Sequence, residues 1–177
     1  VEYIDGNTSF AADFVNSKLP GVKTHKPQGT YLMWLDFTEA AERIGPAATI
    51  ETVTESGLRG RGGGGFPTGV KWATVAEQPA GQRFVVANAD EGDSGTFADR
   101  MLMEGDPFCL IEGMVIAAHA VGASEGFIYI RSEYPDVFKV MNEAVAIAHA
   151  AGYLGSDVLA SGKAFNIDIR LGAGAYI

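Results

Sequence analysis

The sequence is poor in residues that bind metals or form disulfides. Cys109 is the only cysteine among 177 residues, which excludes an internal disulfide framework and any site built from four cysteines. The three histidines, at positions 25, 119 and 149, are too scattered to show metal-ligand spacing. Because Cys109 lies in an apolar helical run, we expect a buried, unreactive thiol rather than a nucleophile.

Positive charge and long apolar runs are also scarce. Lysine and arginine number 13 against 22 acidic residues, a net charge of −9, which argues against general nucleic-acid binding. The longest apolar run, 108–121, is interrupted by Glu112 and His119 and is too short to span a bilayer. The first residues contain no basic and apolar signal segment. We therefore expect a cytoplasmic protein with no nucleic-acid partner and no direct membrane insertion.

Glycine, by contrast, is abundant and is concentrated in residues 56–69. The charges in and just after this stretch, Arg59, Arg61 and Lys71, are all positive. Exposed glycine N–H groups beside basic side chains form a site for an anion, and a helix that opens at Gly69 adds its dipole. Flexible linkers are rich in glycine and serine and lack an embedded Phe-Pro-Thr-Gly segment. The stretch therefore predicts a phosphate-binding loop for a nucleotide or flavin, with Lys71 either a partner of the phosphate or a solvated helix residue.

Strand and helix patterns alternate after this loop. Apolar strand patterns occupy 83–88, 126–131 and 165–171, and helical patterns occupy 70–77, 106–121 and 134–151. This order predicts an α/β fold, a Rossmann-like and mostly parallel sheet with helices on both faces.

The preceding part of the chain has a different pattern. A helix at 9–18 and strands at 22–26 and 30–37 predict a small α+β segment, followed by helices at 38–44 and 49–56 that Pro46 separates. We expect two domains, 1–45 and 46–177.

An acidic segment follows the first strand of the predicted sheet. Asn88, Asp90, Glu91 and Asp93 lie there, and ligands of open α/β sheets bind beyond the carboxyl ends of strands. Such a segment binds a cation, accepts hydrogen bonds from ribose or flavin, or pairs with nearby arginines. Tyr176 follows the third strand in the same way and flanks a ligand under this interpretation.

Several motifs, in this order, resemble the flavin- and NADH-binding subunits of respiratory complex I, NAD-reducing hydrogenases and NAD-linked formate dehydrogenases. The resemblance covers about residues 45–177, and its motifs are Ser56–Gly69, Asn88–Glu91, Gly95–Arg100, Leu110–Met114, Ile128–Pro135 and Gly172–Tyr176. Within this family, Asp93-Ser94-Gly95-Thr96 and Met103–Phe108 are most similar to the β subunit of a soluble NAD-dependent formate dehydrogenase.

The resemblance implies an FMN site and a neighbouring NAD(H) site. It implies flavin contacts for nine residues: Gly60, Arg61, Gly62, Gly63, Lys71, Asn88, Asp90, Glu91 and Tyr176. For NAD(H) it implies that Phe66 stacks on the dinucleotide, although Phe66 could equally anchor the loop in the core, and that Asp93 lies near the nicotinamide. No residue acts as a nucleophile, because the flavin carries out the hydride transfer.

The implied activity is that of an NADH:acceptor oxidoreductase, a diaphorase module within a multi-subunit NADH dehydrogenase or NAD-dependent formate dehydrogenase. Its expected partners are iron–sulfur and catalytic subunits. Full-length members continue after Ala-Tyr-Ile with a 4Fe–4S domain whose cysteines this sequence lacks. We therefore expect a C-terminally truncated piece that, as the alternative, has no catalytic activity of its own.

Residues 1–37 carry a second resemblance. Leu19–Lys23 and Pro27–Phe37 are similar to the C-terminal small domain of pyridoxal-phosphate aminotransferases of the cystathionine β-lyase-like branch. That family's cofactor lysine and substrate-binding arginine are not in this sequence. The resemblance implies a foreign fusion without aminotransferase activity.

Overall fold

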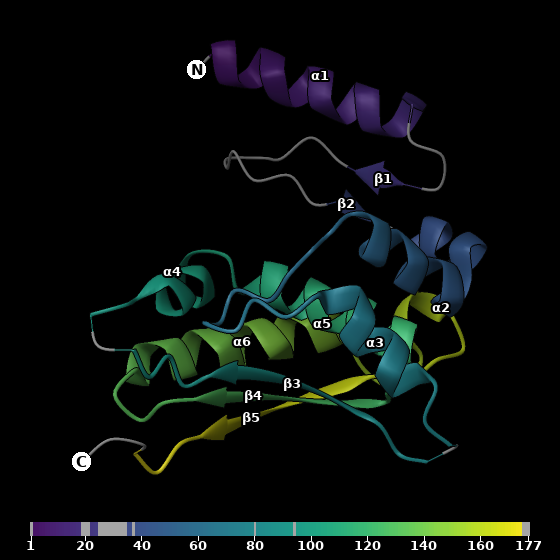
Figure 1. The fold of residues 1–177 in the computed structure, drawn as a ribbon. Helices are drawn as coiled ribbons and strands as arrows, with labels where there is room; N and C mark the ends of the chain where they lie inside the picture. Colours follow the sequence, from purple (N-terminus) through teal and green to yellow (C-terminus); the bar gives the residue numbers. More distant parts are fainter. Residues whose placement is uncertain are drawn as a thin grey trace. The chain divides into compact units, whose positions relative to one another are not determined.

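The computed structural model describes residues 2–18, 22–24, 35–36, 38–79, 81–93 and 95–174 (Figure 1). The chain forms two compact units, residues 1–49 and 50–177. The boundary between the units falls within helix α2 (Thr38–Glu55).

The first unit is built on helix α1 (Glu2–Lys18) and on the short antiparallel pair β1 (Lys23–Thr24) and β2 (Leu35–Asp36). The Asn16 amide fixes the helix to the strand, because it donates to the Thr24 carbonyl at 2.9 Å and accepts from the Thr24 amide at 2.9 Å. The predicted helix is confirmed and begins earlier than expected. Much of the two predicted strands lies outside the described residues.

Helix α2 contains the interruption that the sequence predicts. Gly45 has φ of +68° inside the helix, immediately before Pro46. Proline removes a helical N–H donor and clashes with the preceding turn, and glycine adopts positive φ without a steric penalty. The result is two helical segments joined at a kink.

The second unit contains a three-stranded parallel sheet in the order β3-β4-β5. Its strands are β3 (Phe84–Ala89), β4 (Glu125–Ile130) and β5 (Asn166–Leu171). Its helices are α3 (Thr68–Ala76), α4 (Ala98–Gly105), α5 (Pro107–Val121), α6 (Pro135–Ala150) and the short 3-10 turn η1 (Val158–Ala160). The predicted parallel α/β fold is confirmed, and α4 and η1 are additional elements.

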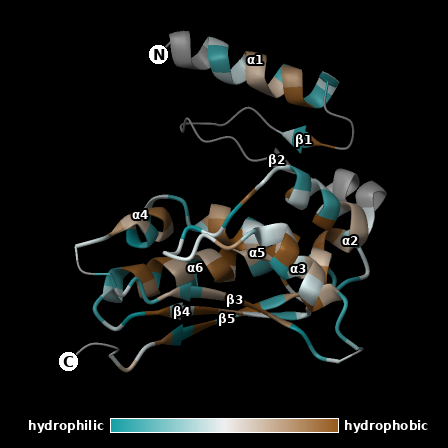
Figure 2. Cartoon of the chain, viewed as in Figure 1, coloured by the Kyte–Doolittle hydropathy of each residue, from teal (hydrophilic) through white to brown (hydrophobic). Residues whose placement is uncertain are grey.

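The core lies between the sheet and helices α5 and α6, and Figure 2 shows hydrophobic segments along these elements. The largest fully buried side chains are Met103, Ile128, Ile130, Val137 and Met141. Arg83, just before β3, ties two helices to the sheet, because its guanidinium donates to the carbonyls of Val121 at 2.9 Å and Gln78 at 2.8 Å. These acceptors lie at or just beyond the ends of α5 and α3, where the helix dipole favours a cation.

The described helices of the second unit cover one face of its sheet, not both as the sequence suggested (Figure 1). On the other face Phe84 is 46% exposed and Val86 is 62% exposed. Crossover connections between parallel strands are right-handed, so consecutive strands added in one direction place every helix on the same side. Helices reach the second face only where the strand order reverses, and the order β3-β4-β5 contains no reversal.

Helix α5 begins at a side-chain cap. The Asp106 carboxylate accepts a hydrogen bond from the Cys109 amide at 3.2 Å, and Pro107 occupies the first turn. The prediction that Cys109 is buried is wrong, because its side chain is exposed. Partial burial and then the charges of Asp106 and Glu112 raise the pKa of the thiol, which favours the unreactive protonated form.

None of the helices in the described ranges is long and apolar enough to cross a membrane.

Candidate cofactor site

The glycine-rich stretch folds back on itself as a closed loop between α2 and α3. The Gly60 amide donates to the Phe66 carbonyl at 2.9 Å, and the Thr68 amide donates to the Leu58 carbonyl at 2.9 Å. The Arg59 guanidinium donates to the Gly65 carbonyl at 3.0 Å. Gly60, predicted as a flavin contact, therefore uses its amide to close the loop.

The tip of this loop presents unused backbone donors. Gly62, Gly63 and Gly64 are exposed, and a Cβ added at any of them would meet no atom within 4 Å. Within the part of the chain that the structure describes, their three amides donate to no acceptor. With the exposed Arg61 between Gly60 and Gly62, this set of donors fits a phosphate group.

The first turns of α3 lie beside this loop. The Lys71 ammonium is 5.9 Å from the centroid of the Phe66 ring, within the range of a cation–π contact. Phe66 is 52% exposed, so its ring does not anchor the loop in the core, and its stacking on a ligand stays a prediction. Lys71 is exposed as well, so its ammonium is accessible to an anion at the loop.

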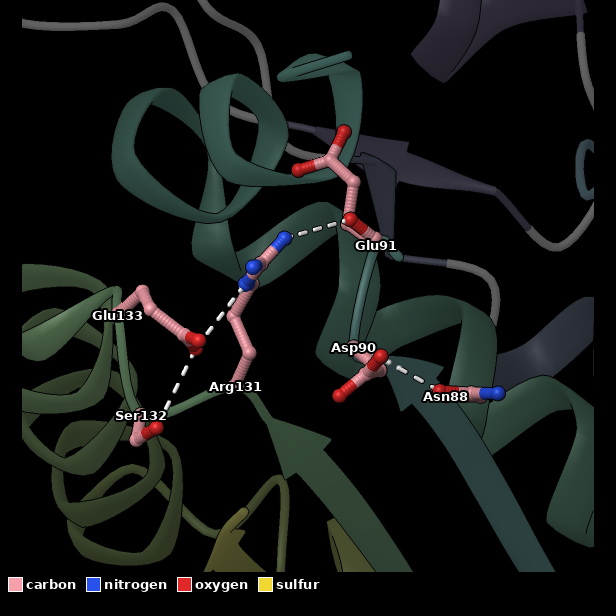
Figure 3. Close-up of polar contacts among 6 residues, drawn as sticks. All are labelled: Asn88, Asp90, Glu91, Arg131, Ser132 and Glu133. Carbon is pink, nitrogen blue, oxygen red and sulfur yellow. Dashed lines mark hydrogen bonds and ion pairs between the residues drawn. The ribbon is translucent and has the colours of Figure 1, made fainter. Parts of the chain in front are cut away.

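The acidic segment follows β3 directly. Asn88 is exposed at the end of the strand, and its side-chain oxygen accepts a hydrogen bond from the Asp90 amide at 3.1 Å (Figure 3). Asp90 is half-buried and Asp93 is exposed. Between them, Glu91 has φ of +45°, a left-handed conformation that costs a non-glycine residue about 1–2 kcal/mol.

The Glu91 side chain caps helix α4. Its carboxylate accepts hydrogen bonds from the backbone amides of Asp99 at 2.9 Å and Arg100 at 3.2 Å, and from the Thr96 hydroxyl at 3.2 Å. Burial opposes ionisation, but these hydrogen bonds, with a further contribution from Tyr134, lower the pKa of Glu91 overall. The carboxylate is therefore ionised and oriented by the helix end. Direct flavin contact by Glu91 stays a prediction.

Arg131 is a further residue of this region that sequence reasoning did not select. It follows β4 and donates from Nη1 to the Glu91 carbonyl at 2.8 Å, and its Nε pairs with Glu133 at 3.2 Å (Figure 3). The Ser132 hydroxyl also donates to Glu133 at 3.2 Å. A usable signal was present in the sequence, because Arg131 follows a strand whose neighbour ends in the acidic segment.

The predicted residues thus form two groups. One is the loop and α3 (Gly60–Gly63, Phe66, Lys71), and the other is the segment after β3 (Asn88, Asp90, Glu91, Asp93). In the described residues no hydrogen bond or ion pair joins the groups, although Figure 1 shows the glycine loop extending toward the end of the sheet where the strand arrowheads lie. Tyr176 lies outside the described residues. No cluster of His, Cys, Asp and Glu suited to a metal ion occurs in the ranges that the structure covers.

A parallel α/β sheet, a glycine-rich anion loop before a helix and polar residues at a strand's carboxyl end define a nucleotide- or flavin-binding domain. The chain belongs to the family described as the Nuo51 FMN-binding domain, whose model matches residues 53–177. The resemblance to the flavin-binding subunit family is thereby confirmed, and FMN is the cofactor in the family's description. The family match does not include residues 1–37 and gives no support to their resemblance to aminotransferases.

Relatives agree with this assignment. The chain is 50% identical over 132 residues to an NADH-quinone oxidoreductase subunit of Rhizobium meliloti (strain 1021), covering 75% of this chain and 31% of that protein. It is 46% identical over 132 residues to NADP-reducing hydrogenase subunit HndC of Solidesulfovibrio fructosivorans, covering 75% of this chain and 27% of that protein.

A solved structure agrees as well. A chain of an NAD+-reducing [NiFe]-hydrogenase in the H2-reduced state is 40% identical with a TM-score of 0.66, covering 74% of this chain and 22% of that chain. The present chain therefore spans about a third or less of the length of these relatives.

Proposed function

We propose that residues 46–177 form the FMN-binding part of a flavin oxidoreductase that exchanges hydride with NAD(H). The observation that carries this proposal is the glycine loop, in which the amides of Gly62, Gly63 and Gly64 have no acceptor among the described residues and whose Phe66 ring lies 5.9 Å from the Lys71 ammonium. The family assignment supports FMN as the ligand that these donors hold.

In this proposal the loop binds the anionic end of FMN. The free loop amides and Arg61 donate to phosphate and ribityl oxygens, and Lys71 adds a positive charge. Gly60 contributes by closing the loop through Phe66. Asn88 and Asp90 face the flavin ring from the end of β3. Glu91, in the same turn, is a third flavin contact in this proposal. Tyr176, which follows β5 in the sequence, is proposed as a further flavin contact.

The nicotinamide dinucleotide is proposed to lie against Phe66, whose exposed ring offers a stacking surface. Asp93, also exposed, is proposed to lie near the nicotinamide. FMN, when bound, supplies the ring nitrogen that accepts or returns the hydride. The residues of this chain bind and orient the reacting rings and set the local charge.

We further propose that the module works within a multi-subunit dehydrogenase, in the cytoplasm where NAD(H) is available, with iron–sulfur and catalytic subunits as partners. The names of its relatives, subunits of a quinone oxidoreductase and a hydrogenase, support such an assembly. Assignment to an NAD-dependent formate dehydrogenase is a finer proposal that rests on the residue pattern around Asp93 and Met103–Phe108.

Titration of FMN with the protein tests the binding step. FMN fluorescence should be quenched on binding, and Lys71→Glu should raise the dissociation constant about tenfold or more, because it replaces a charge-assisted contact with repulsion. Lys139→Glu is the matched control, since Lys139 is also an exposed helix lysine but pairs with Asp136 on α6. Wild-type protein that does not quench FMN would refute the proposal.

Anaerobic addition of NADH to the FMN-loaded protein tests the second step. Bleaching of the flavin's visible absorbance is expected. Retention of the oxidised spectrum would restrict the proposal to FMN binding.

A further inference from the structure

The turn after β3 has a backbone conformation that its neighbours must maintain. Glu91 has φ of +45°, and non-glycine residues persist in this region only where the surrounding contacts determine it. Two contacts are local, namely the Asn88 side chain on the Asp90 amide and the Glu91 carboxylate on the start of α4. The third comes from the next strand and is the hydrogen bond from Arg131 to the Glu91 carbonyl.

Strand register explains why Arg131 reaches this carbonyl. Ala89 and Ile130 are paired at the ends of β3 and β4, so Arg131 leaves its strand level with the start of the turn. Figure 3 shows the guanidinium between Glu91 and Glu133. Its side chain is only 22% exposed, it pairs with Glu133, and it lies 5.2 Å from the centroid of the Tyr134 ring. Three contacts on one planar group orient it firmly.

The consequence concerns which groups of the turn are available to a ligand. The Glu91 carbonyl is occupied by Arg131 and its carboxylate by α4. The Asn88 side-chain oxygen holds the Asp90 amide, so the Asn88 NH2 group and the Asp90 carboxylate remain at the carboxyl end of β3. The hydrogen bond to Glu133 is the main cause that raises the pKa of the guanidinium, and the charge of Asp90 adds to it.

We infer that Arg131 is a positioning residue for the flavin site, acting through the Glu91 carbonyl and the charge of Asp90. The inference rests on the proposed function, since it takes the flavin ring as the ligand of this turn. Removing the guanidinium frees the turn to leave its left-handed conformation and takes this cation away from Asp90. Both changes alter the surroundings of a bound flavin and leave the phosphate-binding loop untouched.

The test compares Arg131→Met, Arg131→Lys and the control Arg170→Met. Arg170 makes the same kinds of contact, an ion pair with Asp168 and a ring contact with Phe127, but on the uncovered face of the sheet. Arg131→Met should raise the FMN dissociation constant about tenfold, because FMN binding must then order a turn that the charged hydrogen bond to the Glu91 carbonyl holds in the wild type. Arg131→Lys should recover part of the affinity, and Arg170→Met should bind like wild type.

A readout at saturating FMN separates positioning from a general loss of folding. The midpoint potential of FMN bound to Arg131→Met should shift to a lower value, because loss of a positive charge near the site disfavours the electron-rich reduced flavin, and the visible spectrum should change. Unchanged affinity, potential and spectrum in Arg131→Met, with wild type binding FMN normally, would overturn this inference alone. Failure of wild type to bind FMN would overturn the proposed function and this inference with it.

Discussion

The carboxylate of Glu91 accepts a 2.9 Å hydrogen bond from the backbone amide of Asp99, in the first turn of helix α4. A residue predicted for its chemistry toward a ligand is thus also the cap of a helix. The amides at a helix start lack partners within the helix and carry partial positive charge, so an ionised carboxylate stabilises them. Through this contact the orientation of α4 and that of the acidic segment depend on each other.

Loss of this cap should destabilise the protein. Glu91→Ala should lower the free energy of unfolding by about 1–2 kcal/mol, the usual effect of removing a side-chain cap, as measured by urea denaturation without FMN. Glu104→Ala serves as the control, because Glu104 lies on the same helix in an exposed pair with Arg100. Its loss should change stability by about 0.5 kcal/mol or less. Equal effects of the two changes would contradict a capping role.

The contribution of Glu91 should also depend on pH in one direction. Its pKa is lowered in the folded protein, so the unfolded chain takes up the proton first as the pH falls from about 4.3. The added stability is therefore complete above the unfolded pKa and disappears as the pH falls through the folded pKa. The stability difference between wild type and Glu91→Ala should be constant near neutral pH and should shrink in acid. A difference that grows as the pH falls would be inconsistent with this ionised cap.

Gly69 fixes the base of the glycine loop. A Cβ at this buried position would lie 2.7 Å from the Thr54 Cα, a backbone atom of α2 that cannot move aside cheaply. Gly69→Ala should therefore cost about 1–3 kcal/mol of stability, as overpacking usually does.

Gly113→Ala is the matched comparison for Gly69→Ala. Gly113 is exposed within α5, and nothing lies within 4 Å of its Cβ position. Alanine there should raise stability by up to about 1 kcal/mol because it favours the helix. Urea midpoints for the two variants should move in opposite directions, and a neutral Gly69→Ala would show that α2 and α3 are packed less closely at this point.

The strands and long helices of the second unit were predictable from local signals. The run Phe84–Ala87 marks β3, and Pro135 and Gly152 mark the two ends of α6. Helix α4 was not predicted, because it is only 8 residues long and its N-cap residue, Phe97, makes no side-chain cap, so its stability comes from contacts outside the helix. Those contacts are the Glu91 cap and the complete burial of Met103.

The candidate site was predictable in composition but not in arrangement. Glycines beside Lys71 and carboxylates after a strand are visible in the sequence. Which amides remain free depends on how the loop closes through Gly60. The role of Arg131 depends on the pairing of two strands 40 residues apart in the chain. The uncovered sheet face depends on strand order, which no local pattern encodes.

Stability should also depend on pH through His119, a basic residue near the end of α5. Its Nδ1 lies 3.1 Å from the Lys163 ammonium, and its buried Nε2 has no hydrogen-bond partner in the described structure. Burial and then the charge of Lys163 lower the pKa of His119. As the pH falls below about 6.5, the unfolded chain binds a proton that the folded protein resists, so stability should fall.

Lys163→Met should weaken this dependence. Without the neighbouring cation the pKa of His119 moves back toward its ordinary value, and the loss of stability between pH 7.5 and about 5.5 should become smaller than in wild type. Lys139→Met, whose lysine pairs with Asp136, should leave the dependence unchanged over that range. Urea denaturation at several pH values, together with an NMR titration of the His119 ring, measures both quantities. A His119 pKa that does not rise in Lys163→Met would show that burial alone lowers it.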